Sequence, residues 1–430
     1  MTDRVEYEII FGLENLGMPR EEMSRRLAEM VTFFGMEELL EKDTMALSGG
    51  EMQTLNIAAA VAMNPELLLL DEPASQLDPV AARKLFELLY QINEELGITI
   101  VVAEQRLEDL ISYADVMYYM QEGTVRAGGT PPEVYEACRS REDLIGADSF
   151  FPSYFRLPEG QKLFTKKEVR RWFCDNYRER PQAVANQEAV TGRDEIECRN
   201  LFFRYEKKEP DVIRECSLSI GKGAVTFIAG GNGSGKSTFL RLLKGDRRPY
   251  LGRIKNMPKS CGYLPQQPEY LFLRETVREE IGDREKVKAL AEAFGLAGYE
   301  EQNPHDLSGG EKERLALALV MGEEREIYLL DEPTRGLDAK SKQILRNLLG
   351  EYKERGKTFV VVSHDMEFMA ETADYAALMF RGSIEAVSEA RSFFVENQFY
   401  TTSMNRIARE VSRNIITVED VERYAEKNSH

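Results

Sequence analysis

The chain has 430 residues, with 56 basic and 74 acidic side chains and a formal net charge of −18, so it is longer than one ordinary domain of about 150 residues. The acidic balance argues against a nucleic-acid-binding surface spread over the molecule, and we expect no nucleic acid as a partner. The apolar runs at 67–70 and 359–362 are far shorter than the roughly 20 residues that span a bilayer. The five cysteines form no Cys-x-x-Cys pair, which disfavours a zinc site or a disulfide framework and favours the reducing cytosol.

The first part of the chain contains short motifs that return later. Leu47-Ser-Gly-Gly-Glu51 recurs as Leu307-Ser-Gly-Gly-Glu311, and positions 47 and 307 differ by 260. An apolar run ending in Leu-Asp-Glu-Pro recurs at the same offset, at 70–73 and 330–333, and so does Leu77-Asp78. Three motifs at one offset indicate a tandem duplication of one unit, and we call the two halves copy one and copy two.

The two copies differ at their front ends. Copy two begins near Glu195, where residues 196–205 alternate like a strand. Val5-Glu-Tyr-Glu-Ile9 matches Val277-Arg-Glu-Glu-Ile281, which aligns Met1 with a position about 78 residues inside copy two. A complete pair would then have about 510 residues. We expect a truncated reading frame, and we expect the apolar strand at 67–70 to lack its neighbours.

A short extension and a linker separate the two copies. Residues 165–172 resemble residues 417–424, and both segments read as short C-terminal helices, with Thr165 as a helix cap. The polar residues 181–194 read as a linker.

Copy two contains a phosphate-binding motif. Its sequence from Gly230 to Ser237 fits GxxxxGK[ST], after a β-rich run at 224–229 and before a helical stretch at 238–244. Glycines let successive backbone N–H groups turn inward around phosphate oxygens, and the helix N-terminus adds its dipole. Lys236 would neutralise the β- and γ-phosphates, and the Ser237 hydroxyl would hold Mg²⁺.

Two carboxylates follow a buried strand of copy two. Asp331 and Glu332 end the strand at 326–330, and the carboxyl end of such a strand lies beside the phosphate loop in a parallel sheet. Asp331 suits the Mg²⁺ shell, and Glu332 can polarise the attacking water. An exposed acidic turn is the alternative interpretation.

Together these motifs resemble an ATP-binding cassette (ABC) ATPase. The resemblance rests on the phosphate loop, Leu-Ser-Gly-Gly-Glu, the apolar run with Asp-Glu, Gly336-Leu-Asp338 and the histidine in Val361-Val-Ser-His-Asp365. It covers residues 195–385 fully and residues 1–136 in part. It implies an α/β P-loop NTPase with a RecA-like parallel core, an antiparallel β subdomain and a helical subdomain, in two tandem cassettes of which the first is incomplete.

The resemblance implies an ATP hydrolase that uses ATP and Mg²⁺, and it gives further residues their roles by position. Glu332, His364 and Gln266 would be catalytic, and Ser237, Gln266 and Asp331 would hold the metal. Gln266 has a rival in the adjacent Gln267. The nucleotide would be bound by the phosphate loop and the residue after it: Gly230, Gly231, Asn232, Gly233, Ser234, Gly235, Lys236, Ser237 and Thr238.

Two more residues of copy two receive roles through the resemblance. Tyr205 looks like the aromatic residue that stacks on adenine, although a core aromatic on a strand remains the alternative. Asp338 looks like the residue that couples two nucleotide sites across a dimer.

In this family the Leu-Ser-Gly-Gly-Glu motif acts on the nucleotide of the opposite cassette. The serine starts a helix, and its hydroxyl, the glycine N–H groups and the helix dipole present an anion site. The resemblance therefore implies nucleotide contacts from Ser48, Gly49, Gly50 and Glu51 in copy one, and from Ser308, Gly309 and Gly310 in copy two. The cassettes would pair within one chain or between two chains.

Copy one has only some of the residues that form the nucleotide site. It has the 47–51 motif, Asp71, Glu72 and Asp78, but it has no phosphate loop, and Gln105 occupies the position of the histidine. Glutamine can donate a hydrogen bond but cannot carry a proton. We therefore expect one ATP per intrachain pair, between 230–237 and 47–51.

Within the family, residues 5–15, Leu77-Asp78-Pro79 and the segments near 165 and 417 resemble the ATPases of energy-coupling factor (ECF) importers. This resemblance implies a cytoplasmic protein, peripheral on the inner face of the cell membrane. Its partners would be a transmembrane scaffold subunit and a substrate-capture subunit that import a vitamin, a vitamin precursor or a metal ion.

The expected organisation follows from these assignments. It comprises a truncated first cassette (1–136), the extension of copy one with the linker (137–193), a complete second cassette (194–385) and a C-terminal extension (386–430).

Two other interpretations stay open. One is a soluble tandem ABC ATPase of the translation-factor type, although that group typically has Thr-Asn-His-Leu-Asp where this chain has Ala74-Ser-Gln-Leu-Asp78 and Thr334-Arg-Gly-Leu-Asp338. That group also typically has a basic linker, whereas residues 141–193 of this chain carry 10 basic and 8 acidic side chains, a nearly balanced charge. The other interpretation is a non-functional fragment.

Overall fold

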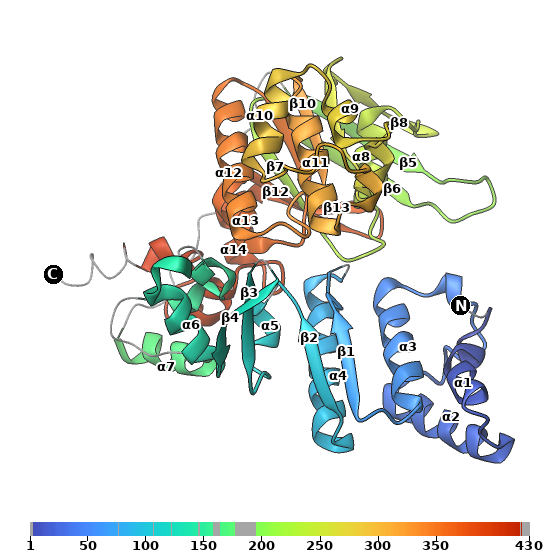
Figure 1. The fold of residues 1–430 in the computed structure, drawn as a ribbon. Helices are drawn as coiled ribbons and strands as arrows, with labels where there is room; N and C mark the ends of the chain where they lie inside the picture. The colour runs from blue at the N-terminus through green and yellow to red at the C-terminus, as the bar shows by residue number, and fades with distance from the viewer. Residues whose placement is uncertain are drawn as a thin grey trace. The chain divides into compact units, whose positions relative to one another are not determined.

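The computed structural model describes residues 3–75, 77–105, 107–121, 123–144, 147–157, 164–176, 195–421 and 423. The chain divides into two compact units, Met1–Asp115 and Val116–His430, and each is described by itself (Figure 1). The linker predicted at 181–194 lies outside the described residues.

Three helices form one half of the first unit: α1 (Val5–Asn15), α2 (Arg20–Phe34) and α3 (Gly49–Ala62). A 3₁₀ turn, η1 (Thr44–Ala46), leads into α3. Val5, Ile9 and Leu13 are fully buried, because their spacing of four residues places them on one face of α1.

The other half of the first unit is a two-stranded parallel sheet. β1 (Leu67–Asp71) pairs with β2 (Thr99–Ala103), and α4 (Pro79–Leu96) connects them before the short α5 (Leu107–Leu110). Among the described residues β1 and β2 pair only with each other. Leu67 and Leu69 are therefore 49% and 67% exposed, in agreement with the expectation that this apolar strand lacks neighbours.

The second unit begins with the end of copy one. A hairpin of β3 (Met117–Gln121) and β4 (Thr124–Gly129) is followed by α6 (Pro131–Ser140) and by α7 (Lys166–Asn176). Between the two helices lie the 3₁₀ turns η2 (Glu142–Leu144), η3 (Ala147–Phe150) and η4 (Ser153–Arg156). Thr165 caps α7 as the sequence predicts, because its hydroxyl oxygen accepts the Glu168 N–H at 3.2 Å.

The extensions of the two copies pack together inside the second unit. Both η4 and α7 contact α15 (Ser403–Ala408), which belongs to copy two. The hydroxyl groups of Ser153 and Ser403 lie 3.3 Å apart. The structure thus groups residues 116–136, which the sequence assigns to the first cassette, with the second cassette.

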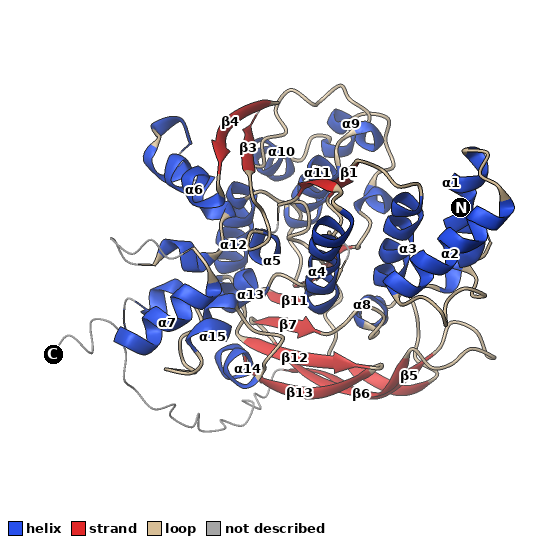
Figure 2. Cartoon of the chain, turned by 90° about the horizontal axis from the view of Figure 1, so that it is seen from below, coloured by secondary structure: helices blue, strands red, loops and turns tan. Residues whose placement is uncertain are grey.

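Copy two is built on a six-stranded sheet in the order β13-β12-β7-β11-β10-β9, and Figure 2 labels β13, β12, β7 and β11 of this sheet. All neighbouring pairs are parallel except the antiparallel β12–β13 pair. The strands are β7 (Val225–Ala229), β9 (Cys261–Leu264), β10 (Ile327–Asp331), β11 (Thr358–Val362), β12 (Tyr375–Phe380) and β13 (Ser383–Glu389).

A separate antiparallel sheet has the order β6-β5-β8. Its strands are β5 (Glu195–Phe203), β6 (Ile213–Gly221) and β8 (Leu251–Lys255). The parallel core, this antiparallel sheet and the helices around them confirm the predicted α/β P-loop ABC ATPase fold.

Some helices of copy two cover the parallel sheet, and others form the segment between β9 and β10. They are α8 (Lys236–Lys244), α9 (Val277–Ile281), α10 (Glu285–Ala293), α11 (Gly309–Met321), α12 (Ala339–Glu354), α13 (Met366–Thr372) and α14 (Ala390–Glu396). The 3₁₀ turns η5 (Pro268–Leu271) and η6 (Pro304–Asp306) precede α9 and α11.

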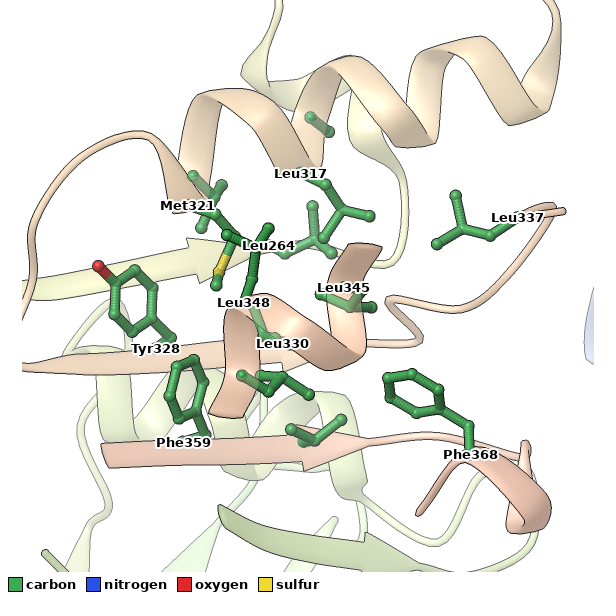
Figure 3. Close-up of a cluster of buried hydrophobic side chains, with 14 of the residues drawn as sticks. Leu264, Leu317, Met321, Tyr328, Leu330, Leu337, Leu345, Leu348, Phe359 and Phe368 are labelled. Carbon is green, nitrogen blue, oxygen red and sulfur yellow. The ribbon is translucent and has the colours of Figure 1, made fainter. Parts of the chain in front are cut away.

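β10 lies between β11 and β9 in the sheet, and all five of its residues are buried. On one face Tyr328 stacks on Phe359 of β11, with ring centroids 5.0 Å apart (Figure 3). Leu330 lies in the same cluster with Leu264 of β9 and Leu345 of α12. Burial of both faces explains the continuous apolar run that precedes Asp331.

The internal repeat offers a matched test of burial, because equivalent strand residues of the two copies differ in their exposure. Leu329 is fully buried, whereas Leu69, its equivalent 260 residues earlier, is 67% exposed. We expect Leu329→Ala to lower the free energy of unfolding by about 2–5 kcal/mol and Leu69→Ala to change it by less than about 0.5 kcal/mol. Far-UV circular dichroism measures both effects, because each of the two units contains helices whose signal is lost on unfolding. Equal effects of the two substitutions would contradict the assigned burial.

Candidate nucleotide site

The predicted phosphate loop connects β7 to the N-terminus of α8. Gly230 has φ 154°, and a Cβ atom there would lie 2.3 Å from the carbonyl oxygen of Met379 on β12. Gly235 has φ 106°, and a Cβ atom there would lie 3.1 Å from the carbonyl oxygen of Val212. The loop therefore needs glycine at both positions, because side chains are excluded by backbone strain and by backbone contacts.

Lys236 is buried beneath this loop. Its Nζ donates hydrogen bonds to the carbonyl oxygens of Gly230 and Gly231 at 2.8 and 2.9 Å. Ser234 is also buried, and its hydroxyl has no hydrogen-bond partner among the described residues. The loop thus brings together a cation, a hydroxyl group and the N-terminus of α8. These three donors are typical of an anion site.

Asp331 lies at the end of β10 and is 1% exposed. Burial raises the pKa of this carboxyl, although the Ser237 hydroxyl, Lys236 and Arg241 oppose that shift. Both carboxylate oxygens are buried, and the Ser237 hydroxyl is the neutral hydrogen-bonding group that acts on them. A desolvated carboxylate beside a serine hydroxyl fits a Mg²⁺ ion, which binds oxygen ligands.

Glu332 follows Asp331 in the left-handed region, with φ 57°, and its N–H donates to the carbonyl oxygen of Val362 at 2.8 Å. Its Oε2 accepts the backbone N–H of His364 at 3.0 Å, and its Oε1 lies 3.4 Å from the Nε2 of His364. The same Nε2 lies 3.2 Å from the Oδ1 of Asn232 in the phosphate loop. Three residues that the sequence singled out separately therefore meet at one edge of the sheet.

Gln266 and Tyr205 lie at the margins of this site. Gln266 is exposed and comes two residues after β9, whose last residue, Leu264, pairs with Leu330. Tyr205 is 45% exposed, and its hydroxyl lies 3.0 Å from the Thr238 hydroxyl on α8. These positions are compatible with the predicted roles, which remain predictions, as does the choice of Gln266 over Gln267.

Both Leu-Ser-Gly-Gly-Glu motifs form helix N-termini with a capping box. At α3, Ser48 N–H donates to Glu51 Oε2 at 2.8 Å, and Ser48 Oγ accepts Glu51 N–H at 3.3 Å. At α11, Ser308 N–H likewise donates to Glu311 Oε2 at 2.8 Å. The hydrogen bonds with Ser48 lower the pKa of Glu51.

The capping glutamates take up the serine N–H groups, but the next N–H groups have no partner inside the helix. These belong to Gly49 and Gly50 at α3 and to Gly309 and Gly310 at α11. Both motifs can therefore present backbone donors to an anion.

Asp338 and Asp78 are helix caps. The carboxylate of Asp338 accepts the Ser341 N–H at 2.7 Å, and that of Asp78 accepts the N–H groups of Val80 and Ala81 at 3.0 and 2.9 Å. These hydrogen bonds show that each aspartate caps the start of a helix. The predicted coupling role of Asp338 stays a prediction.

Copy one repeats the backbone of the site with different side chains. Glu72 has φ 42°, and its N–H donates to Ala103 at 2.8 Å, as Glu332 does to Val362. The Nε2 of Gln105 donates to Glu72 Oε1 at 2.8 Å. Asp71, however, is exposed, in contrast to the buried Asp331.

Arg241 and Glu313 are two residues near the site that sequence reasoning missed. Arg241 lies on α8 and forms hydrogen bonds with Tyr205 and Tyr263, which raise its pKa. Glu313 is buried on α11. Arg241 lies four residues after Ser237 and Glu313 lies two residues after Glu311, so both are outside the motifs and neither was singled out before the fold was known.

The part of the chain that the structure describes contains no group of three or more His, Cys, Asp or Glu side chains arranged to hold a metal. One buried aspartate with a serine hydroxyl is consistent with Mg²⁺ that completes its shell with phosphate and water. No helix among the described residues has the length and apolar character to cross a membrane.

Comparisons with known proteins agree with this geometry. The family model described as "ABC transporter" matches residues 3–75 and 213–335. A protein of Bacillus thuringiensis subsp. konkukian, named "Putative ABC transporter ATP-binding protein", is 36% identical over 98% of this chain and 81% of its own length. The chain belongs to the ABC transporter ATP-binding protein family and is a tandem-cassette ATP-hydrolysing protein.

Two further similarities are to a curated protein and to a solved structure. A Bacillus subtilis protein named "Putative HMP/thiamine import ATP-binding protein YkoD" is 30% identical over 86% of this chain and 70% of its own length. The solved structure of an archaeal ribosome recycling factor, aABCE1, has a TM-score of 0.59 at 24% identity and covers 90% of this chain and 71% of that chain. The second similarity concerns the fold alone.

Proposed function

We propose that this protein is the ATP-binding and ATP-hydrolysing subunit of an ECF-type importer. The observation that carries the ATPase part is the convergence of Asn232, Glu332 and His364 beside the phosphate loop. Support for the importer type comes from the relative named for HMP/thiamine import and from the sequence resemblance of residues 5–15 and 77–79 to ECF ATPases. The cargo would be a vitamin, a vitamin precursor or a metal ion.

The phosphate loop would bind the nucleotide through its backbone N–H groups and Lys236. On binding, Lys236 Nζ exchanges the carbonyl oxygens of Gly230 and Gly231 for phosphate oxygens, and this exchange replaces neutral acceptors with charged ones. Ser237, Asp331 and Gln266 would hold Mg²⁺, which supplies charge neutralisation at the transferred phosphoryl group. Tyr205 would stack on the adenine.

Glu332 would act as the general base. Its carboxylate is held by the His364 N–H at 3.0 Å, so its orientation is set before the nucleotide arrives. It can then accept a proton from the attacking water. His364, whose Nε2 lies near both Glu332 and Asn232, would contact the γ-phosphate.

The Leu-Ser-Gly-Gly-Glu motif of copy one would complete the nucleotide site of copy two. The basis is chemical: the phosphate loop provides one anion-binding helix N-terminus, and the start of α3 provides another. In copy one, Gln105 takes the position of the histidine, and glutamine cannot carry a proton. The pair would therefore hold one hydrolysable ATP, whether the cassettes pair within one chain or in a homodimer.

The proposed partners are a transmembrane scaffold subunit and a substrate-capture subunit, with the protein on the inner face of the cell membrane. Hydrolysis would open the cassette pair, and this motion would be passed to the scaffold. A soluble tandem ATPase is the competing assignment, because the archaeal recycling factor shares the tandem fold.

A transport assay separates these assignments. We expect cells that lack this chain to lose uptake of one cargo among radiolabelled thiamine, Co²⁺ and Ni²⁺, and we expect wild-type protein, but not Glu332→Gln, to restore it. The tagged protein should fractionate with membranes. Unchanged uptake of all three probes together with sedimentation on ribosomes would contradict the importer assignment and favour the soluble one.

A matched pair of glycines tests which motif completes the site. Apart from its chain neighbours, a Cβ atom at Gly49 or at Gly309 would have no described atom within 4 Å, so either position leaves room to begin a side chain, and the negative charge of aspartate repels phosphate. We expect Gly49→Asp to lower ATP turnover at least about 100-fold and Gly309→Asp to lower it less than about threefold. The opposite order would show that copy two pairs with a second copy two.

A further inference from the structure

An arginine that has no role in the proposed mechanism lies over the ring of Tyr205. Arg247 belongs to the turn between α8 and β8, and Tyr205 follows the end of β5. The guanidinium carbon of Arg247 lies over the Tyr205 ring, 5.9 Å from its centroid. This distance is within the range of about 6 Å over which a cation is attracted to an aromatic face. Two separate segments of copy two thus bring a planar cation over an aromatic ring.

The ring of Tyr205 is held beside the phosphate loop. Its hydroxyl lies 3.0 Å from the hydroxyl of Thr238, the residue directly after Ser237. Its ring also packs on Phe203, with centroids 5.1 Å apart and an angle of 81° between the two planes. Tyr205 nevertheless remains 45% exposed. Its position relative to the phosphate loop is therefore fixed, while part of its surface stays accessible to a ligand.

The charge of Arg247 is not matched by an acid, in contrast to two cations near it in the chain. Arg204 pairs with Asp211 at 2.9 Å, and Lys244 pairs with Asp246 at 2.9 Å. Arg247 is exposed, and its side chain forms neither an ion pair nor a hydrogen bond with any residue that the structure describes. The contact with the Tyr205 ring can therefore be exchanged for a contact with a ligand without breaking an ion pair.

The separation of the two side chains suits a flat ligand. Stacked planar groups lie about 3.5 Å apart, so a base inserted between a ring and a guanidinium group needs about 7 Å. The observed 5.9 Å is about 1 Å short of this value, and a long, exposed arginine side chain can move by that amount. A purine base can stack on an aromatic ring with one face and on an arginine guanidinium plane with the other.

We propose that Arg247 is a nucleotide-binding residue whose guanidinium group stacks on the face of the adenine opposite Tyr205. The inference rests on the role of Tyr205 that we propose above. On binding, the guanidinium group moves away from the tyrosine ring, and the base enters between the two side chains. Arg247 would then favour ligands that carry a base over bare polyphosphates, whereas Lys236 and the phosphate loop would bind both.

The test measures Kd by isothermal titration calorimetry for two ligands on the full chain in the presence of Mg²⁺. One ligand is the non-hydrolysable analogue β,γ-imido-ATP, and the other is inorganic tripolyphosphate, which has no base. We expect Arg247→Ala to raise the Kd of the analogue about tenfold, because one stacking contact with the base is lost. The Kd of tripolyphosphate should change less than about twofold.

Two matched variants separate stacking from charge. Arg248→Ala removes the same charge from the next residue, which is also exposed, and both Kd values should stay within about twofold of the wild type. Arg247→Lys keeps the charge but not the planar group, so it should bind the analogue nearly as weakly as Arg247→Ala does. Far-UV circular dichroism should be the same for all variants, because both arginines are exposed.

An unchanged Kd of the analogue in Arg247→Ala would overturn the proposal. Equal weakening of both ligands would also overturn it, because Arg247 would then act on the phosphates, and so would wild-type affinity in Arg247→Lys, which would show that charge alone suffices. Tyr205→Ala tests the underlying assignment and should weaken the analogue alone, by at least about tenfold. If Tyr205→Ala has no such effect, the adenine role of Tyr205 is refuted. If it has this effect and Arg247→Ala has none, only the inference about Arg247 fails.

Discussion

The nucleotide site depends on three parallel strands that end at the same edge of one sheet. β7, β11 and β10 are consecutive neighbours, and each leads into a loop that carries part of the site: the phosphate loop, His364 and the Asp331–Glu332 pair. Because parallel strands in register bring their carboxyl ends together, residues separated by about a hundred positions come within hydrogen-bond distance. The contact between His364 and Asn232 at 3.2 Å is the direct result.

Burial of these strands also sets the chemistry at their ends. Asp331 follows a strand with both faces covered, so its carboxylate is desolvated and its pKa is raised. Asp71 follows the equivalent strand of copy one, which is paired on one edge only, and it is exposed. The backbone is the same in both copies, with Glu72 and Glu332 both in the left-handed region. The two copies thus share a local geometry and differ in the environment that would make it catalytic.

The sequence predicted the fold and most of the site because those features are local. The phosphate loop, the helix starts at Ser48 and Ser308, and the strand before Asp331 each follow from residue types within a few positions. The grouping of residues 116–136 with the second unit could not be predicted, because it depends on packing such as that of η4 and α7 against α15. Glu313 was missed for a related reason, since its burial on α11 depends on packing within copy two.

The central claim is that copy two contains the hydrolytic site and that copy one does not hydrolyse ATP. It is tested most directly by comparing ATP turnover of Glu332→Gln with that of Glu72→Gln, the equivalent substitution in copy one. Both variants remove a carboxylate from the same backbone geometry, so each serves as the control for the other. The account predicts at least about a 100-fold loss of turnover for Glu332→Gln and less than about a threefold loss for Glu72→Gln. Equal losses, or a larger loss for Glu72→Gln, would contradict it.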